Sequence, residues 1–406
     1  MNRVAVIGLA VLAIVGGLGL GMLAAGAAHP SASGPAGSGL VAAIGSGHPS
    51  AQPLPSSPEP SDSGSTTPSS SPSAAPLPTP TPSPTPVLVP APLTGRLVTP
   101  EAAARHPIAV MIDDLSPARP QSGYSAASIV WQAPAEGGIP RYMMIFQENI
   151  PTDVGPVRSS RYYYIAWAAE VRALYAHAGG SPQALATLKA KGQGQLVYNA
   201  DEFRWGSQFR RIQSRFAPHN LYTTGKQLRR ISQLQGIKDT PVAWPWTFAP
   251  DLAPELRPIG GQIEVDYLAN HILYRYDNRT NTYLRSNSTE KKQIDAATGK
   301  RVAPKNVVVM LMHFGPLGDD THHHRLEATV IGTGPAWIST NGKTIQGTWK
   351  KTALTSPTQF FDKAGKPVVL TIGQTFVQVM PYGSKMTFKA GKAPPPMLRP
   401  IGLTAF

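Results

Sequence analysis

The stretch PIAVMIDD, residues 107–114, is an apolar run that ends in two carboxylates, Asp113 and Asp114. A short apolar run bounded by proline and by charged residues is typical of a buried strand. Two further runs, at 127–133 and 142–147, have the same character. Because open α/β sheets bind ligands beyond the carboxyl ends of their strands, Asp113 and Asp114 are candidate ligand-binding residues.

Segments with helical character alternate with these strands. Residues 160–173 form one such segment. Ser181 and Pro182 are typical of the N-cap and the first turn of a second helix. Strands that alternate with helices predict an α/β domain over residues 96–257.

Residues 258–390 show a different pattern, in which β-branched runs are divided by turn residues and no helical period is visible. The run Asn306–Met312 predicts a fully buried strand. Asn341 and Gly342, between two apolar runs, are typical of a tight β-hairpin turn. This segment therefore predicts a small all-β domain, barrel or sandwich, which is followed by a tail at 391–406.

The N-terminal segment, residues 1–28, has one basic residue, Arg3, followed by 25 residues without charge. About 20 apolar residues suffice to cross a bilayer, so the length favours an uncleaved transmembrane anchor. A cleavable signal peptide is the alternative, because Ala25-Gly26-Ala27 is a small-residue cleavage site. We therefore expect a single-pass cell-membrane protein with an exported C-terminal ectodomain, or a secreted protein if the signal is cleaved.

Residues 29–95 are rich in proline, serine and alanine. A segment of this composition cannot bury enough apolar surface to fold, and proline stiffens it toward polyproline II. It predicts a disordered linker that holds the folded part away from the membrane.

The absence of cysteine and the excess of basic residues limit the possible functions. With no Cys in 406 residues, disulfides, Cys-ligated metals, thiolate nucleophiles and a lipid-modified cysteine are excluded. The net charge is +14, and the only charged residues before Gly95 are Arg3, Glu59 and Asp62, so the folded part carries the excess. A basic exported surface favours an anionic cell-wall polymer, lipid headgroups or an envelope protein as partner, and export argues against nucleic acid.

One segment of the α/β domain concentrates this positive charge. Aromatic residues are interleaved with its basic ones, an arrangement that suits an anionic polymer, although a solvated basic face is the alternative. The basic residues are Arg204, Arg210, Arg211, Arg215, Lys226, Arg229 and Arg230.

Three residues near predicted strand ends or loops are candidate catalytic residues: Glu136, His177 and His219. A carboxylate and an imidazole are the usual general acid and base, so the three would share proton transfer in a hydrolase. His177 ends a strand just before Gly179-Gly180, where a ligand can approach the backbone closely.

Further residues of the α/β domain are candidates for holding an anionic ligand. Arg158 and Arg161 flank the start of a predicted helix, where guanidinium groups and free N–H groups suit a phosphate or carboxylate. Besides the two aspartates, the candidate ligand-binding residues are Arg141, Arg158, Ser159, Arg161, Ser181 and Asn220.

Each of these residues also has a structural interpretation. The aspartates can cap a turn, and the arginines can pair with Glu136 or with the aspartates instead of a ligand. His177 can be a hydrogen-bonded core residue, and Ser181 an N-cap. Convergence of these residues at one place depends on the order of the strands in the sheet.

The segment DDTHHH, residues 319–324, places His322 and His324 on one face of an extended chain. Imidazole and carboxylate groups suit zinc or nickel, but no third spaced ligand appears, so adventitious binding is favoured over a dedicated metal site. Signatures of nucleotide binding, zinc peptidases and serine hydrolases are absent from the sequence, and no cofactor is expected.

Several motifs together resemble the YerB-like family of bacterial envelope proteins, whose members are often described as candidate lipoproteins. The resemblance implies two domains over about residues 96–382 and an envelope location, and it implies no particular reaction. This chain departs from the lipoprotein description because it has no cysteine to modify. The motifs are PIAVMIDD (107–114), ARPQSG (118–123), PAEGGIPRY (134–142), GPVRSSR (155–161), HAGGSP (177–182), PHNLY (218–222), YDNRTNTYLR (276–285), KNVVVM (305–310), GTWKK (347–351) and GQTFVQVMP (373–381).

Three functions are compatible with these observations. The first is a non-catalytic module that binds cell-wall polymer or an envelope partner through the basic α/β domain. The second is a cell-wall-modifying hydrolase that uses the Glu, His and Arg residues. The third is a structural scaffold of a membrane complex. No sequence feature demands turnover, so binding is ranked first and enzymatic activity is left open.

Overall fold

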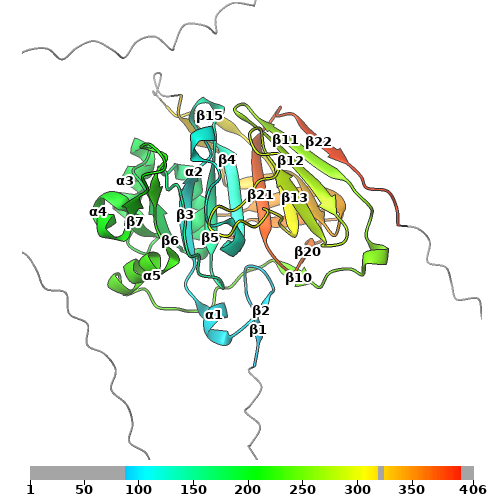
Figure 1. Cartoon of the computed structure of the whole chain (residues 1–406), viewed down its shortest axis with the longest axis horizontal. Coiled ribbons are helices and arrows are strands. Elements are labelled where there is room, and N and C mark those ends of the chain that lie inside the picture. The colour runs from blue at the N-terminus through cyan, green and yellow to red at the C-terminus, as the bar shows by residue number, and fades with distance from the viewer. Residues whose placement is uncertain (1–86, 319–323, 395–406) are drawn as a thin grey trace, which may run out of the picture. The chain divides into compact units, whose positions relative to one another are not determined.

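The computed structural model describes residues 87–318 and 324–394 (Figure 1). The predicted anchor and most of the predicted linker lie outside the described residues, as does His322. The linker does not extend to residue 95 as predicted, because the described part begins at Val87 and Leu93 is fully buried in the core. The apolar residues that follow the last prolines therefore belong to the folded body.

A ten-stranded mixed sheet forms the centre of the fold, in the order β19-β18-β17-β14-β21-β4-β5-β3-β6-β7. Strand β3 is the opening run of the sequence analysis, and it is buried along its whole length. The N-terminal half of the chain contributes β3 (Ile108–Asp113), β4 (Ile129–Pro134), β5 (Pro140–Phe146), β6 (Leu174–His177) and β7 (Tyr198–Asp201). The C-terminal half contributes β14 (Asn306–Met312), β17 (Gly332–Thr340), β18 (Lys343–Lys351), β19 (Gln359–Asp362) and β21 (Thr375–Pro381).

The two halves are joined inside this sheet. Strand β21 pairs in parallel with β4, from Thr375 opposite Ile129 to Gln378 opposite Gln132. The segment 258–390 is therefore not a separate barrel or sandwich, because five of its twelve described strands extend the sheet of the α/β half. Strand β4 is buried along its whole length, so its backbone N–H and C=O groups require a partner strand along each edge, and β5 and β21 supply them.

All α-helices of the described residues belong to the N-terminal half. Helix α2 packs against one face of the sheet, where Trp167 stacks on Trp131 of β4 with ring centroids 4.8 Å apart. Helix α5 packs through Leu228 and Ile231 into the core on the other face. None of the described helices combines the length and the apolarity needed to cross a bilayer. The helices are α1 (Pro100–Ala104), α2 (Tyr162–Ala168), α3 (Pro182–Lys191), α4 (Glu202–Trp205) and α5 (Gly225–Leu234).

A second, four-stranded sheet, in the order β13-β12-β11-β22, packs against the C-terminal half of the large sheet. Figure 1 shows it beside β21. Its strands are β11 (Gln262–Tyr267), β12 (Asn270–Asp277), β13 (Thr282–Ser286) and β22 (Met386–Lys389). Four two-stranded ribbons complete the described part: β1 (Val89–Pro90) with β2 (Leu97–Val98), β8 (Arg210–Arg211) with β9 (Leu221–Tyr222), β10 (Thr247–Ala249) with β20 (Val369–Thr371), and β15 (Phe314–Pro316) with β16 (Leu326–Ala328).

A buried polar network links the second sheet to the N-terminal half. The guanidinium group of Arg285, on β13, is fully buried and lies 5.4 Å from the ring centroids of Tyr142 and Tyr274. Its Nη2 donates to Gln132 Oε1 at 2.6 Å, and Gln132 Nε2 donates to Asp114 Oδ2 at 2.7 Å. Burial raises the pKa of Asp114, although the charges of Arg119 and Arg285 oppose the shift. One glutamine side chain thus bridges a buried cation and a buried carboxyl group.

We predict that Arg285→Ala lowers the free energy of unfolding by about 3–5 kcal/mol, because it leaves buried acceptors without their donor. Urea unfolding of the full chain measures this loss. Arg275→Ala is the matched control, since Arg275 is exposed on the neighbouring strand β12 and its loss should cost no more than about 0.5 kcal/mol. Equal stability of the two variants would contradict a structural role of the network.

Candidate functional site

The order of the strands brings most of the predicted site residues to one edge of the large sheet. Strands β3, β6 and β7 run parallel to one another, and β4 has the same direction because both it and β3 are antiparallel to β5. Their carboxyl ends therefore lie along one edge, which we call the strand-end edge. Asp113 and His177 are the last residues of β3 and β6, and Glu136 follows β4.

Glu136 lies between two arginines at this edge. Arg161 Nη2 donates to Glu136 Oε2 at 2.5 Å, and Arg141 Nη2 lies 3.4 Å from the same oxygen. Burial alone would raise the pKa of Glu136, but the hydrogen bond from Arg161 and the charges of both arginines outweigh it and hold the pKa below its usual value. A carboxylate held in this way is a poor general acid, so the structure favours an ion-pair role for Glu136.

Arg141 is a largely enclosed cation of this cluster, with its side chain 12% exposed. Its Nη1 donates to the backbone carbonyl of Ser159 at 3.1 Å. Burial and the nearby charge of Arg161 lower the pKa of Arg141 to about 10, so the group stays protonated at neutral pH. Ser159 thus contributes to this cluster through its backbone carbonyl, whereas the sequence suggested a ligand-binding residue.

Asp113 forms a second cluster with Arg158 and His219. Its Oδ2 lies 3.0 Å from Arg158 Nε and 2.7 Å from His219 Nδ1, and its Oδ1 accepts from the backbone N–H of Leu115 at 3.0 Å. The Asp113 side chain is buried, whereas those of Arg158 and His219 are 22% and 16% exposed. Asp113 therefore orients an imidazole ring whose edge is accessible to a ligand.

Two further candidates, His177 and Ser181, have structural roles. His177 is fully buried, and its ring contacts the carbonyl of Gly179 and Asn199 Oδ1 at 2.8 Å each, so it does not join Glu136 and His219 in an open site. Ser181 is the N-cap of α3, since its hydroxyl accepts from the N–H of Ala184. These findings correct the expectation of one catalytic constellation, because hydrogen bonds within the fold already occupy the polar atoms.

Asn220 and Asp114 also have partners inside the protein. Asn220 Oδ1 accepts from Arg211 Nη1 at 3.0 Å, and its Nδ2 donates to two carbonyls of the same loop. Asp114 faces the interior and takes part in the network of Arg285. Neither side chain is placed to hold an external ligand.

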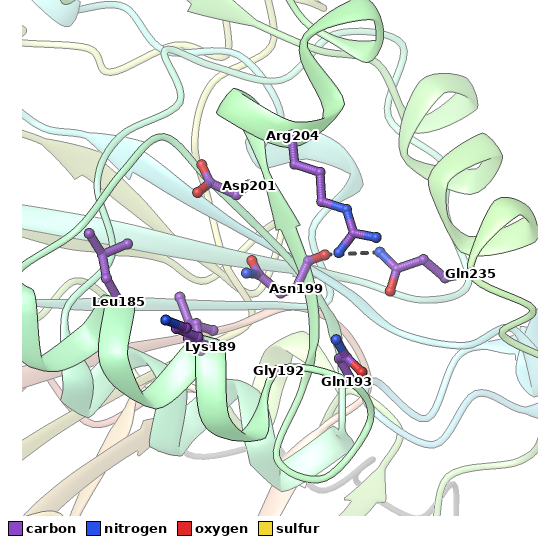
Figure 2. Close-up of a pocket in the computed structure, with 9 residues that line it drawn as sticks. Leu185, Lys189, Gly192, Gln193, Asn199, Asp201, Arg204 and Gln235 are labelled. Atoms are coloured by element: carbon purple, nitrogen blue, oxygen red, sulfur yellow. Dashed lines mark hydrogen bonds between the residues drawn. The ribbon is translucent and has the colours of Figure 1, made fainter.

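A pocket of about 340 Å³ lies beside the strand-end edge (Figure 2). We call it the edge pocket, because Asn199 and Asp201 of the outermost strand, β7, line it. Figure 2 shows the Arg204 side chain reaching from α4 toward Asn199 and Gln235, and Gln235 Nε2 donates to the carbonyl of Asn199 at 2.9 Å. The lining residues are Leu185, Leu188, Lys189, Gly192, Gln193, Asn199, Asp201, Arg204 and Gln235.

The edge pocket is physically connected to the predicted residues. Asn199, which lines it, contacts the buried His177 ring, and Asp201 Oδ1 lies 3.5 Å from the backbone N–H of Gly179. The sequence analysis singled out Arg204 only as part of a basic run. The pocket itself was missed, because its walls come from three segments, 185–193, 199–204 and Gln235, and the sequence does not show that they converge.

Two phenylalanines near the strand-end edge are strongly exposed, Phe203 by 80% and Phe216 by 91%. Phe203 covers the turn after β6, since a Cβ added at Gly179 would lie 3.5 Å from its ring. The predicted basic run is partly structural here: Arg210 pairs with Asp153 at 2.6 Å, and Arg215 donates to the carbonyls of the 118–120 segment. Arg204 and Arg230 of this run form no ion pair within the described residues. These two side chains and the two exposed rings are therefore available to a ligand.

The metal candidate remains a prediction. His322 lies outside the described residues, and His324 is the only histidine of the 319–324 segment that the structure describes. Within 87–318 and 324–394 no group of three or more His, Asp or Glu side chains is arranged to hold a metal ion.

An α/β half and a β half that share one mixed sheet define the class of fold, and comparison with known proteins identifies the family. Residues 93–238 match the N-terminal domain, and residues 263–377 the C-terminal domain, of the protein family of unknown function DUF3048. The chain belongs to this family. The resemblance inferred from the motifs is thereby confirmed.

Two comparisons with a protein of Bacillus subtilis support the assignment to this family. The chain is 31% identical over 297 residues to the protein named "Putative lipoprotein YerB" of strain 168, covering 72% of this chain and 86% of that protein. It is similar to the crystal structure of Bacillus subtilis YerB with a TM-score of 0.66 and 28% identity, covering 73% of this chain and 99% of that one.

We predict that Glu136→Gln destabilises the protein by roughly 2–3 kcal/mol at pH 7, because two enclosed arginines lose their counter-charge. The folded-state pKa of Glu136 is lowered, so its contribution is present above the unfolded pKa of about 4.5 and is lost as the pH falls through the folded pKa. Urea unfolding at several pH values should therefore show the stability difference shrinking below about pH 4.5. Glu264→Gln, which breaks an exposed pair with Lys389, should show little effect at any of these pH values.

Proposed function

We propose that this protein is an extracytoplasmic binding protein that recognises an anionic polymer of the cell envelope without chemical turnover. The observation that carries the proposal is the edge pocket, which is lined by two cations, Lys189 and Arg204, and by a single carboxylate, Asp201, next to the exposed Phe203. Supporting it, most of the polar groups proposed for catalysis have partners within the fold.

The two cations of the edge pocket are available to a ligand. Both Lys189 and Arg204 are exposed, and neither forms an ion pair with any residue that the structure describes. Arg204 instead lies over the ring of Trp205 at 5.6 Å, which leaves its guanidinium edge free to donate hydrogen bonds. Exposed charges of this kind attract a polyanion in a way that salt screens.

The exposed phenylalanine adds an apolar surface to this charge. A ring that is 80% exposed costs free energy in water unless a partner covers it, and sugar rings present C–H faces that pack on aromatic rings. A polymer of sugars with phosphate or carboxylate groups satisfies both features. The envelope location is supported by the uncharged segment at 4–28 and by the name of the Bacillus subtilis relative.

The double substitution Lys189→Ala/Arg204→Ala should weaken binding of the full chain to purified cell walls at least tenfold. The physical reason is the loss of two charge-assisted contacts, each worth about 1.5–3 kcal/mol when a charged group is involved. Co-sedimentation in mild detergent at increasing salt measures the affinity. Lys363→Ala/Lys366→Ala removes the same charge from an exposed turn between β19 and β20 and should bind as the wild type does. Undiminished binding to walls stripped of their anionic polymers would overturn the proposal.

A second candidate function, hydrolysis, is supported by one specific observation. Asp113 contacts His219 Nδ1 at 2.7 Å, an arrangement in which the carboxylate fixes the tautomer and leaves Nε2 to act as a base. Arg158 on the same carboxylate could then hold an anionic substrate. This pair replaces the set of Glu136, His177 and His219 that the sequence suggested.

The same cell walls separate the two candidates. As a binding protein, the full chain should release no soluble wall fragments over hours, whereas a hydrolase would release fragments that His219→Gln abolishes. His271→Gln is the matched control, because His271 contacts Asp266 in an exposed pair on the second sheet. Release that depends on His219 but not on His271 would favour the enzyme.

A further inference from the structure

A second basic pocket lies at the opposite edge of the large sheet. Its volume is about 260 Å³, and it shares no residue with the edge pocket. Two of its residues, Lys305 and Gln374, immediately precede β14 and β21. Because these strands run parallel to β4, their first residues lie at the edge remote from the strand ends. We call this cavity the entry pocket.

Four cationic side chains and no carboxylate line the entry pocket: those of Arg96, Lys300, Arg301 and Lys305. Two of them are neutralised by neighbours outside the lining. Arg96 pairs with the buried Glu148 at 3.2 Å, and Lys305 pairs with Asp251 at 2.6 Å.

The other two cations have no counter-charge. Neither Lys300 nor Arg301 forms an ion pair within the described ranges, so the pocket carries an excess of two positive charges. Arg301 is anchored, since its Nη2 donates to the carbonyl of Arg285 at 3.2 Å. Its Nε is buried without a hydrogen-bond partner. A buried donor without an acceptor is costly, and the side chain that carries it lines the pocket.

The backbone allows the cations to approach one another. Gly373 has a φ of +137°, and a Cβ added there would lie 2.5 Å from Lys305 Cγ and 3.8 Å from Arg96 Nη2. The two side chains therefore pass close to one backbone position that has no side chain of its own. Ser125 and Thr282 add hydroxyl groups to the lining, each of which is hydrogen-bonded to a neighbouring threonine.

We propose that the entry pocket binds the phosphate group of a phosphate ester. An excess of two positive charges matches the charge of a phosphomonoester, and guanidinium and ammonium groups are the side chains that bind phosphate best. The proposal goes beyond the binding function at the edge pocket, because it concerns different residues at a different edge.

Isothermal titration of the full chain with inorganic phosphate and with glycerol 3-phosphate tests the proposal. We expect saturable binding that is at least tenfold weaker in Lys300→Gln/Arg301→Gln. Lys363→Gln/Lys366→Gln, with the same loss of charge, should retain wild-type affinity. Lys300→Glu serves as a second variant that spares the contacts of Arg301, since Lys300 is exposed. No saturable binding, or equal affinity in the pocket and control variants, would overturn it.

Two larger probes distinguish the sources of the phosphate. Dihexanoyl phosphatidic acid below its micelle concentration presents a lipid phosphomonoester, and a glycerol phosphate oligomer with a terminal phosphate presents a wall polymer. Binding of either probe that is lost in Lys300→Gln/Arg301→Gln supports the pocket and names the source. Lys189→Ala/Arg204→Ala should leave phosphate binding unchanged, so failure of one proposal is separable from failure of the other.

Discussion

The buried guanidinium of Arg285 is the constraint on which the arrangement of the two halves depends. A charge without exposed surface must find its partners inside the protein, and here they are Gln132 on β4, Tyr274 on β12 and Gln293. These groups come from both halves of the chain. They can be satisfied only when β4 pairs with β21 and the second sheet lies over this junction. A second fully buried ion pair, between Lys351 and Glu170 at 2.9 Å, likewise joins residues of the two halves, on the opposite face of the sheet.

Because the halves share a sheet, the direction of the strands decides where the ligand-accessible groups lie. The parallel strands bring their carboxyl ends to one edge and their first residues to the other. The edge pocket lies beside the first edge and the entry pocket at the second, and both contain more cations than carboxylates. The two binding proposals thus concern groups at opposite ends of the same parallel strands.

The sequence was sufficient for local elements and insufficient for their partners. The apolar run at 107–113, the N-cap at Ser181 and the hairpin turn at Asn341-Gly342 all form as predicted, because each depends on neighbouring residues. The shared sheet was not predicted, since the pairing of β4 with β21 joins residues almost 250 positions apart. One signal was present: Gln132 interrupts an otherwise apolar strand, and a polar residue buried at such a position requires a distant partner.

The same distinction applies to the candidate site. The sequence placed arginines and carboxylates near predicted strand ends, but it could not show whether they converge or which of them neutralise one another. In the structure, Glu136 is held by two arginines and Asp113 by Arg158 and His219, so their charges stabilise the edge itself. Four cations form no ion pair with any residue that the structure describes, Lys189 and Arg204 at one edge and Lys300 and Arg301 at the other, and these are available to an external group. An unpaired cation at a pocket is thus stronger evidence for binding than a paired one, and this asymmetry favours recognition of an anion over catalysis.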